Sequence, residues 1–269
     1  MGYENIEIER DGPVATLWLN RPEKLNAMSA DIWRDIPAAM AEIDADDSAR
    51  VVIFAARGPA FTVGIDIELL ASLQPGEGSR AESSMQLYRT IRQLQRTASC
   101  FAESPKPVIA AVHGYCLGGG MDLITACDLR VAAEDAIFSI RETRMGLVAD
   151  VGTLQRLPAI VGPGHTAELA YTGKDIDAGR ALAIGLVNDV LATVDAMLRA
   201  VRDTAQQIAE NSPLVIRGIK KALAGNEGRT VEQALDNAAQ WNAAFLISND
   251  LTEAVSAFVE KRKPDFTGT

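Results

Sequence analysis

The feature that most constrains the fold is a change of pattern near Leu191. Before this point, short runs of β-branched and other apolar residues alternate with segments whose apolar residues recur at helical spacing. After it, only helical patterns follow. Strands that alternate with helices are typical of an α/β domain with a mostly parallel sheet. We therefore expect an α/β core over residues 1–192 and a helical region over residues 193–269.

The predicted strands of the core are short, apolar and bounded by turn residues. They cover Ile6–Ile8, Val14–Leu19, Val51–Ala56, Val108–Val112, Leu129–Ala132 and Ile137–Ile140. Ser29 can cap a helix that reaches about Asp44, because a serine side chain accepts a hydrogen bond from the free N–H groups of a first helical turn. A second helix, rich in arginine, is predicted from Ser79 to about Glu103.

The region after Leu191 is predicted to form four helices, two of which have clear start signals. Pro213 suits the first turn of a helix, and Thr230 and Gln233 form a capping box. The predicted helices are Thr193–Asn211, Pro213–Leu223, Thr230–Ile247 and Leu251–Lys261. Large apolar residues such as Phe245 and Phe258 are more numerous than a surface appendage needs, so we expect burial against a partner subunit.

Bulk properties exclude several classes of protein. The net charge of −10 disfavours nucleic acid as a main partner. The three cysteines and two histidines lack the spacing of metal ligands, so we expect buried, reduced thiols and no metal. No apolar run approaches the roughly 18 residues of a membrane span. Neither Met1–Arg10 nor Phe266–Thr269 resembles a targeting signal, and we therefore expect a cytoplasmic protein.

Two glycine-containing segments follow predicted strands and open helices. Gly118, Gly119 and Gly120 follow Val108–Val112, and Phe61–Ile67 follows another strand. Free backbone N–H groups at such positions suit an anion or an enolate oxygen, and two such segments could supply the paired donors of an oxyanion hole. Close packing of a helix on a strand also requires glycine. The alternative to an oxyanion hole is therefore that the two segments are unrelated turns between a strand and a helix.

Four segments together resemble the crotonase (enoyl-CoA hydratase/isomerase) superfamily, in the order of that family. They are Asn20–Ala27, Phe61–Ile67, Pro105–Gly114 and Gly118–Gly120. The resemblance implies a spiral of ββα units, a helical C-terminal trimerisation region and an acyl-CoA thioester substrate. It also implies that the N–H groups of Ile65 and Gly119 polarise the thioester carbonyl. Coenzyme A would be part of the substrate, with no separate cofactor, and the assembly would be a homotrimer or a dimer of trimers.

The same resemblance suggests where coenzyme A binds. It places Asn20–Ala27 near the adenine and phosphates, with Lys24 and Asn26 as candidates, although a solvated loop explains these side chains equally well. The pantetheine and thioester would contact a second set of residues: Val63, Gly64, Ile65, Asp66, Ile67 and Gly120. The segment Ser72–Ser84 is expected to shape the acyl pocket.

The reaction depends on three acids, Asp122, Glu142 and Asp150. Hydratases of the family carry glutamates at the first two positions and typically a glycine at the third. The dienoyl-CoA isomerases of fatty-acid β-oxidation place Asp, Glu and Asp there. They also resemble this chain over Leu147–Pro158, so the resemblance is closest to the Δ(3,5)-Δ(2,4)-dienoyl-CoA isomerases.

The chemistry of that reaction suits two carboxyl groups. Converting a 3,5-dienoyl-CoA to a 2,4-dienoyl-CoA removes a proton from C2 and adds one to C6, and a base and an acid can do this. Burial and like charge must raise at least one pKa so that one acid stays protonated. We favour Glu142 at C2 and Asp150 at C6, with the reverse left open. Asp122 would orient a neighbour or hold a proton.

Two other functions remain as alternatives. An enoyl-CoA hydratase that adds water to a 2-enoyl-CoA could use Glu142, but it leaves Asp150 without a role, and Asp122 is one methylene shorter than the expected glutamate. A non-catalytic, RNA-binding member of the superfamily would need a basic helix. The stretch Arg80–Arg96 is basic, but the chain as a whole is acidic.

Overall fold

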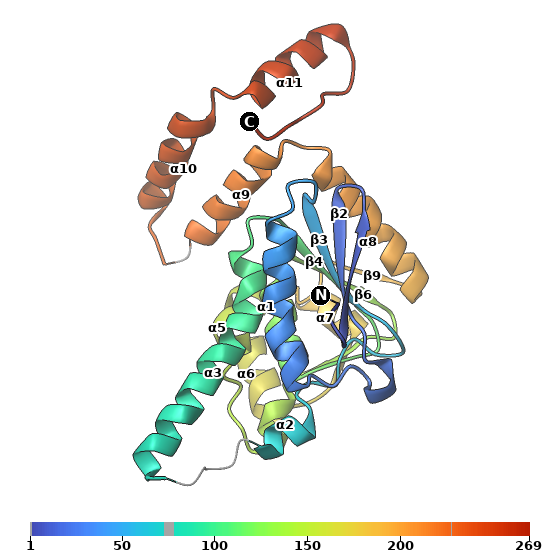
Figure 1. The fold of residues 1–269 in the computed structure, drawn as a ribbon, viewed down its shortest axis with the longest axis vertical. Helices are drawn as coiled ribbons and strands as arrows, with labels where there is room; N and C mark the ends of the chain where they lie inside the picture. Colours follow the sequence, from blue (N-terminus) through green and yellow to red (C-terminus); the bar gives the residue numbers. More distant parts are fainter. Residues whose placement is uncertain (1, 73–77, 227) are drawn as a thin grey trace.

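The computed structural model describes residues 2–72, 78–226 and 228–269. Its centre is a six-stranded sheet in the order β1-β2-β3-β4-β6-β9, in which only β1 and β2 are antiparallel (Figure 1). These strands are β1 (Ile6–Asp11), β2 (Val14–Leu19), β3 (Val51–Ala56), β4 (Val108–Val112), β6 (Leu129–Ala133) and β9 (Asp189–Leu191). A smaller sheet contains β5 (Tyr115–Leu117), β7 (Ile137–Ser139) and β8 (Ile176–Asp177).

The chain moves between the two sheets in a repeating way. Strand β4 lies in the large sheet, β5 lies in the small one, and the helix α4 (Gly119–Ile124) follows. Strands β6 and β7 repeat this order before the 3₁₀ turn η2 (Arg141–Met145) and the helices α5 (Thr153–Val161) and α6 (Pro163–Thr172). The predicted spiral of ββα units is therefore confirmed.

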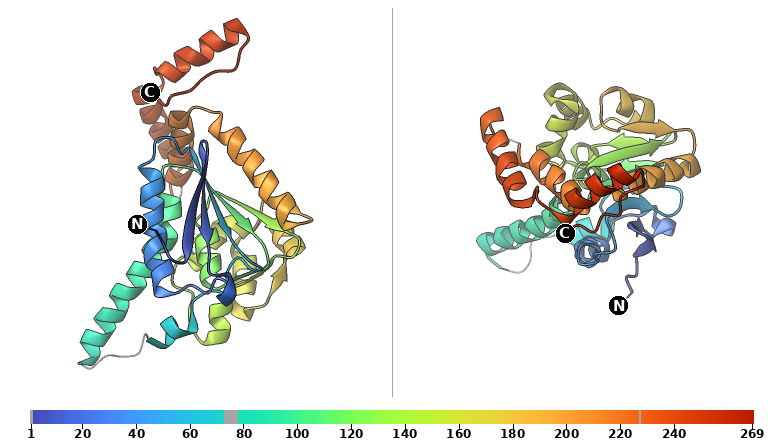
Figure 2. Two further views of the ribbon diagram at one scale, coloured as in Figure 1. Left: turned by 45° about the vertical axis from the view of Figure 1, so that its right-hand side comes forward. Right: turned by 90° about the horizontal axis from the view of Figure 1, so that it is seen from above.

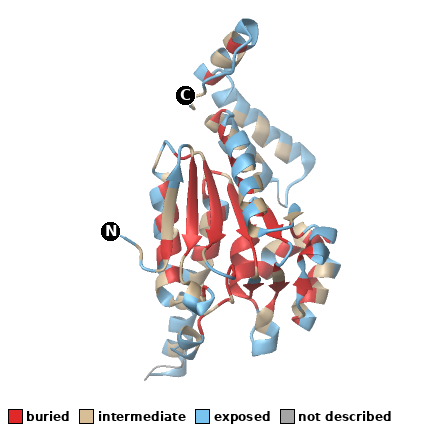
Figure 3. Cartoon of the chain, turned by 90° about the vertical axis from the view of Figure 1, so that its right-hand side faces the viewer, coloured by how far each residue is buried: buried red, intermediate tan, exposed pale blue. Residues whose placement is uncertain are grey.

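Helices cover both faces of the large sheet. Alternate residues of β3 face opposite cores, since Phe54 packs among α1 (Ala30–Asp44) and α3 (Arg80–Glu103), whereas Ile53 packs against α8 (Val194–Ala209). All six residues of β3 are buried as a result. Figure 3 shows this buried band running through the strands. It explains why the strand reads as a continuous apolar run in the sequence.

The helices with clear capping signals are confirmed. Ser29 caps α1, in which Ile32, Ile36, Met40 and Ile43 are buried, and Thr230 caps α10 (Val231–Phe245) with a capping box. The glycine triplet opens a helix as expected, and this helix, α4, begins at Gly119 itself. Several short elements were not predicted from the sequence, including β5, β8, β9 and the helix α7 (Ala178–Ala183). A strand of two or three residues is too short to show a periodicity.

The last three helices leave the body of the molecule. They are α9 (Pro213–Gly225), α10 (Val231–Phe245) and α11 (Asn249–Glu260), and they form an arm beyond the end of the sheet (Figure 2). The Lys220 ammonium group attaches α9 to the core, because it donates to the carbonyls of Phe101 and Lys106 and pairs with Asp128 at 2.8 Å. No helix within the described part of the chain is long and apolar enough to cross a membrane.

Two predictions about these regions remain open. Of the segment Ser72–Ser84, residues 73–77 lie outside the described residues. The division of the chain at residue 192 also stays a prediction. The first helix beyond it, α8, buries Met197 and Val201 against the large sheet, so the arm itself starts only with α9.

Candidate active site

The two glycine-containing segments lie side by side in the structure. Thr62 donates to the Tyr115 carbonyl and Leu117 donates to the Thr62 carbonyl, so residues 61–64 run along β5. Gly64 has φ +92°, and a Cβ atom there would lie 2.9 Å from the Leu117 oxygen and 3.6 Å from the Gly119 nitrogen. Only glycine allows this approach, which brings the two segments together.

The two predicted oxyanion donors lie on these adjoining segments. Gly119 is the first residue of α4, and its N–H group therefore has no acceptor within the helix. Ile65 directly follows Gly64. Across the described residues, neither the Ile65 N–H nor the Gly119 N–H donates to a protein acceptor. Both groups are thus free to bind an oxygen atom of a ligand.

The glycine triplet serves more than one purpose. A Cβ atom on Gly120 would lie 2.6 Å from Thr62 Cγ2 and 3.1 Å from Cys116 Sγ, so close packing accounts for this glycine without a ligand. A Cβ atom on Gly119 would lie 3.1 Å from the Trp33 ring. Gly118 has φ +52°, which favours glycine at the turn into α4. Packing therefore accounts for Gly120, while the Gly119 N–H group stays available as a donor.

Asp122 lies on α4 and is buried. Its Oδ1 atom accepts two hydrogen bonds of 2.7 Å from Thr153, one from the backbone N–H and one from the hydroxyl. Burial raises the pKa of Asp122 to about 7, and the charge of Glu142 adds to the effect. Thr153 was not singled out from the sequence, although it lies inside the distinctive stretch Leu147–Pro158.

Glu142 lies next to the glycine turn. Its Oε1 atom would be 3.3 Å from a Cβ atom on Gly118. Its Oε2 atom is buried and has no hydrogen-bond partner among the described residues. An unpaired, desolvated carboxylate is costly, and burial accordingly raises the pKa of Glu142, with a further contribution from the charge of Asp150.

Asp150 lies near the end of the connection between η2 and α5. The residue is exposed, unlike Asp122, but desolvation by the surrounding protein still raises its pKa. Its charge acts on both Glu142 and Asp122. The structure therefore brings the three predicted acids, which span 29 positions of the sequence, into one electrostatically coupled group.

The predicted coenzyme A segment adjoins the thioester segment. Val63 donates to the Leu25 carbonyl and Met28 donates to the Gly64 carbonyl, at 3.2 and 2.8 Å. Arg21 forms an ion pair with Asp66 at 2.5 Å, and this contact lowers the pKa of Asp66. The Asp66 side chain is thereby engaged within the protein.

The other residues predicted to bind coenzyme A differ widely in accessibility. Lys24 and Ile67 are exposed, whereas Asn26 is completely buried. The Asn26 amide accepts from the Arg21 N–H and donates to the carbonyls of Arg57 and Ala60. Its side chain therefore connects loops within the protein, and of the two candidates in this motif only Lys24 can reach a ligand.

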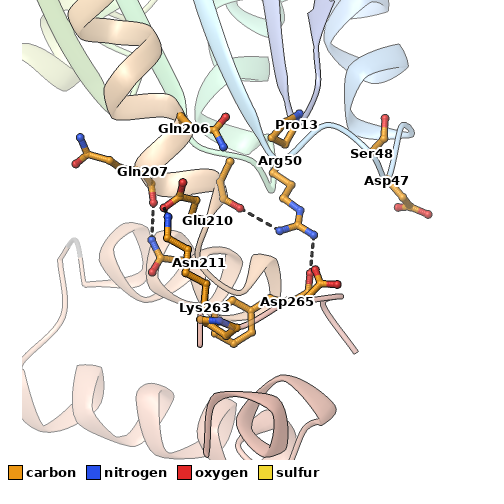
Figure 4. Close-up of a pocket in the computed structure, with 13 residues that line it drawn as sticks. Pro13, Asp47, Ser48, Arg50, Gln206, Gln207, Glu210, Asn211, Lys263 and Asp265 are labelled. Carbon is orange, nitrogen blue, oxygen red and sulfur yellow. Dashed lines mark hydrogen bonds and ion pairs between the residues drawn. The ribbon is translucent and has the colours of Figure 1, made fainter. Parts of the chain in front are cut away.

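A cavity of about 710 Å³ lies far from these residues. It is bordered by Arg50, by the end of α8 and by residues 263–266 near the C-terminus. Arg50 donates hydrogen bonds to the carbonyls of Ala209 and Phe266 (Figure 4). Arg50 precedes β3, whereas the glycine segments follow the carboxyl ends of β3 and β4, so the cavity is at the opposite end of the parallel strands. Within the described ranges, no group of three His, Cys, Asp or Glu side chains could hold a metal ion.

The fold and this site define a class of protein. A model of the enoyl-CoA hydratase/isomerase family matches residues 9–269, and the chain belongs to this family. An enoyl-CoA hydratase from Bacillus anthracis has the same fold, with a TM-score of 0.90 and 30% identity over 99% of this chain and all of that one. The resemblance inferred from the motifs is confirmed, and the protein is an enzyme of the crotonase superfamily.

Two named relatives indicate which members of the family this chain is similar to. The peroxisomal Δ(3,5)-Δ(2,4)-dienoyl-CoA isomerase of Arabidopsis thaliana is 44% identical over 98% of this chain and 97% of its own length. The mitochondrial Δ(3,5)-Δ(2,4)-dienoyl-CoA isomerase of Dictyostelium discoideum is 41% identical over 98% of this chain and 92% of its own length. The chain is thus similar to isomerases of this name over nearly its whole length.

Proposed function

We propose that the protein is a dienoyl-CoA isomerase that converts a 3,5-dienoyl-CoA to a 2,4-dienoyl-CoA in fatty-acid β-oxidation. The observation that carries this proposal is the third acid, Asp150, in the same coupled group as Asp122 and Glu142. A hydratase has no evident use for it. The names of the relatives support the same reaction.

The free backbone donors suggest how the substrate lies. The thioester oxygen would accept hydrogen bonds from the N–H groups of Ile65 and Gly119. In other enzymes, removing one such donor raises the activation free energy by roughly 3–4 kcal/mol. C2 is bonded to the thioester carbonyl carbon and would therefore lie near the turn at Gly118. The Glu142 carboxylate adjoins that turn, which supports Glu142 as the group that acts at C2. Asp150 would act further along the acyl chain, at C6.

The proton balance of the reaction requires one base and one acid. Glu142, as the carboxylate, takes the proton from C2 and leaves a dienolate whose oxygen is held by the two N–H groups. Asp150, as the carboxylic acid, gives its proton to C6. Glu142 is then protonated and Asp150 ionised, and exchange with solvent restores the starting state. The raised pKa values of both groups support this division, because each group must change protonation near neutral pH.

Asp122 has a different part in this scheme. Both hydrogen bonds to its Oδ1 atom come from Thr153, three residues after Asp150. Asp122 therefore holds the chain that carries Asp150, which fits the expectation that it orients a neighbour.

The test is a comparison of initial rates on 3,5-dienoyl-CoA and 2-enoyl-CoA substrates of several chain lengths. We expect isomerisation of the dienoyl substrates to exceed hydration of the enoyl substrates. Faster hydration, with no isomerisation, would make the protein an enoyl-CoA hydratase. Salt-dependent binding of RNA without turnover of either substrate would favour a non-catalytic role.

Further features of the proposal concern the ligand, the assembly and the location. Coenzyme A would enter only as part of the substrate, with Lys24 near its phosphates, and no other cofactor would be needed. The assembly would be a homotrimer or a dimer of trimers. The protein would act in the cytoplasm, whereas the two relatives named above are peroxisomal and mitochondrial.

A further inference from the structure

Asp150 is held by its backbone and not by its side chain. The chain from residue 146 to residue 152 forms no helix or strand, and the Asp150 carboxylate makes no hydrogen bond to another described residue. A proton donor must nevertheless keep a fixed place relative to its substrate. The contacts that hold this stretch are therefore of interest for the reaction.

Helix α3 supplies one of these contacts. The Gln95 side chain donates from Nε2 to the Asp150 carbonyl at 2.6 Å, across 55 positions of the sequence. Arg92 donates to the Oε1 atom of the same amide at 2.6 Å, so both ends of the amide are bonded and its orientation is set. One turn further along the same face of α3, Ser99 accepts from Arg156 at 2.9 Å.

Arg156 covers the last residue of the same stretch. Gly152 has φ +145°, and a Cβ atom there would collide with the Arg156 guanidinium group, which lies directly over it. The Nη1 atom of Arg156 is buried and has no hydrogen-bond partner among the described residues. The C-terminal end of the stretch is thus held by Gln95 at Asp150, by Arg156 over Gly152, and by the bonds from Thr153 to Asp122 directly after it.

We propose that Gln95, oriented by Arg92, is a positioning residue for the proton transfer at C6. It fixes the backbone of Asp150, and through it the place of the carboxyl group relative to the far end of the dienolate. Helix α3 thereby has a function in the reaction, on a face where the sequence indicated only an arginine-rich, partly exposed helix. The inference rests on the proposed isomerase function and adds a residue to it.

The test replaces the Gln95 amide with a side chain of similar length that cannot donate. Gln95→Met removes the hydrogen bond without adding charge near Asp150. Gln93→Met is the matched control, because Gln93 lies on the same helix, is exposed, and its side chain makes no hydrogen bond to the described residues. Both variants, wild type and Asp150→Asn are assayed with a 3,5-dienoyl-CoA in heavy water. Product formation, deuterium at C6 of the product and deuterium at C2 of the recovered substrate are measured.

A positioning role predicts a specific imbalance between the two proton transfers. In Gln95→Met, kcat should fall about 10- to 100-fold with KM changed less than about twofold. Exchange at C2, which depends on Glu142, should continue, so the ratio of C2 exchange to product formation should rise. Arg92→Met should shift the ratio in the same direction by a smaller factor. Gln93→Met should match wild type.

Other outcomes separate a failure of this inference from a failure of the proposed function. If wild type isomerises and Asp150→Asn does not, but Gln95→Met matches Gln93→Met, the positioning role is wrong and the function stands. If Gln95→Met lowers C2 exchange and product formation equally, its role is structural only. If wild type does not isomerise the substrate at all, the proposed function fails and this inference fails with it.

Discussion

The body of the molecule buries most of its large apolar side chains, whereas the C-terminal arm exposes many of its own. In the body, helices cover both faces of the sheet, and Phe54 has 0% of its surface exposed. In the arm, Phe258 and Ile247 are 85% and 97% exposed. The body completes its hydrophobic core within one chain, whereas the arm does not. The candidate active site therefore lies in a unit with its own complete core, and we propose that a partner subunit covers the arm.

The largest expected effect is on the chemistry in the body. Asp150→Asn keeps the side-chain volume and removes the transferable proton, so isomerisation should fall by about 10²–10⁴-fold. Circular dichroism and the oligomeric mass should stay unchanged, because the side chain is exposed and makes no hydrogen bond to another described residue. Normal isomerisation by this variant would mean that Asp150 is structural, and the hydratase alternative would then lead.

A pair of aromatic truncations compares the two regions directly. Phe54 packs against the rings of Phe61 and Phe101, with centroids 5.1 and 4.6 Å apart, so Phe54→Ala should lower the free energy of unfolding by about 3–5 kcal/mol. Phe258→Ala should change it by less than about 0.5 kcal/mol at concentrations where the chain is monomeric. Urea denaturation measures both values. Equal losses would show that the arm is packed on its own body.

The buried acid in the body gives stability a defined pH dependence. The pKa of Asp122 rises from 3.8 to about 7 on folding, so the native state binds the proton more tightly than the unfolded chain. Stability from this group is therefore greatest below about pH 4 and decreases as the pH rises toward 7. Asp122→Asn can still accept from Thr153 but cannot ionise. We expect it to reduce the loss of unfolding free energy between pH 4 and pH 8 by about 2–4 kcal/mol.

That reduction is measured by urea titrations of wild type and Asp122→Asn at both pH values. A loss of stability between pH 4 and pH 8 that is the same in Asp122→Asn and wild type would show that Asp122 does not take up a proton on folding.

The smallest effect on the single chain is expected in the arm, where the effect on assembly should be large. Light scattering of the wild type should give three or six times 28.8 kDa. Ile247→Glu places a charge on the most exposed large apolar residue of the arm and should shift the mass toward 28.8 kDa without lowering the unfolding free energy of the monomer. A wild type that is already monomeric would contradict the prediction that a partner subunit covers the arm.

Local features of the fold could be predicted from the sequence because they depend on neighbouring residues. Capping side chains at Ser29, Ser79 and Thr230 mark helix starts, and the bonds that do so span three residues. The strand Val51–Ala56 was predicted with its observed bounds, because a strand buried on both faces reads as an unbroken apolar run. The structure decides that the helix α4 begins at Gly119 itself, since glycine at the start of a helix resembles a loop in sequence.

The candidate site also has features that could be predicted from the sequence and features that only the tertiary structure decides. The resemblance to the crotonase superfamily identified the three acids and the acyl-CoA substrate, and the two glycine segments stood out from their residues alone. The sequence did not indicate that Asn26 is fully buried, that Gly120 is needed for packing on Thr62, or that Gln95 reaches Asp150. These contacts join residues 34, 58 and 55 positions apart. Which distant side chains meet is decided by how strands and helices stack, and the same packing desolvates Asp122 and Glu142 and raises their pKa values.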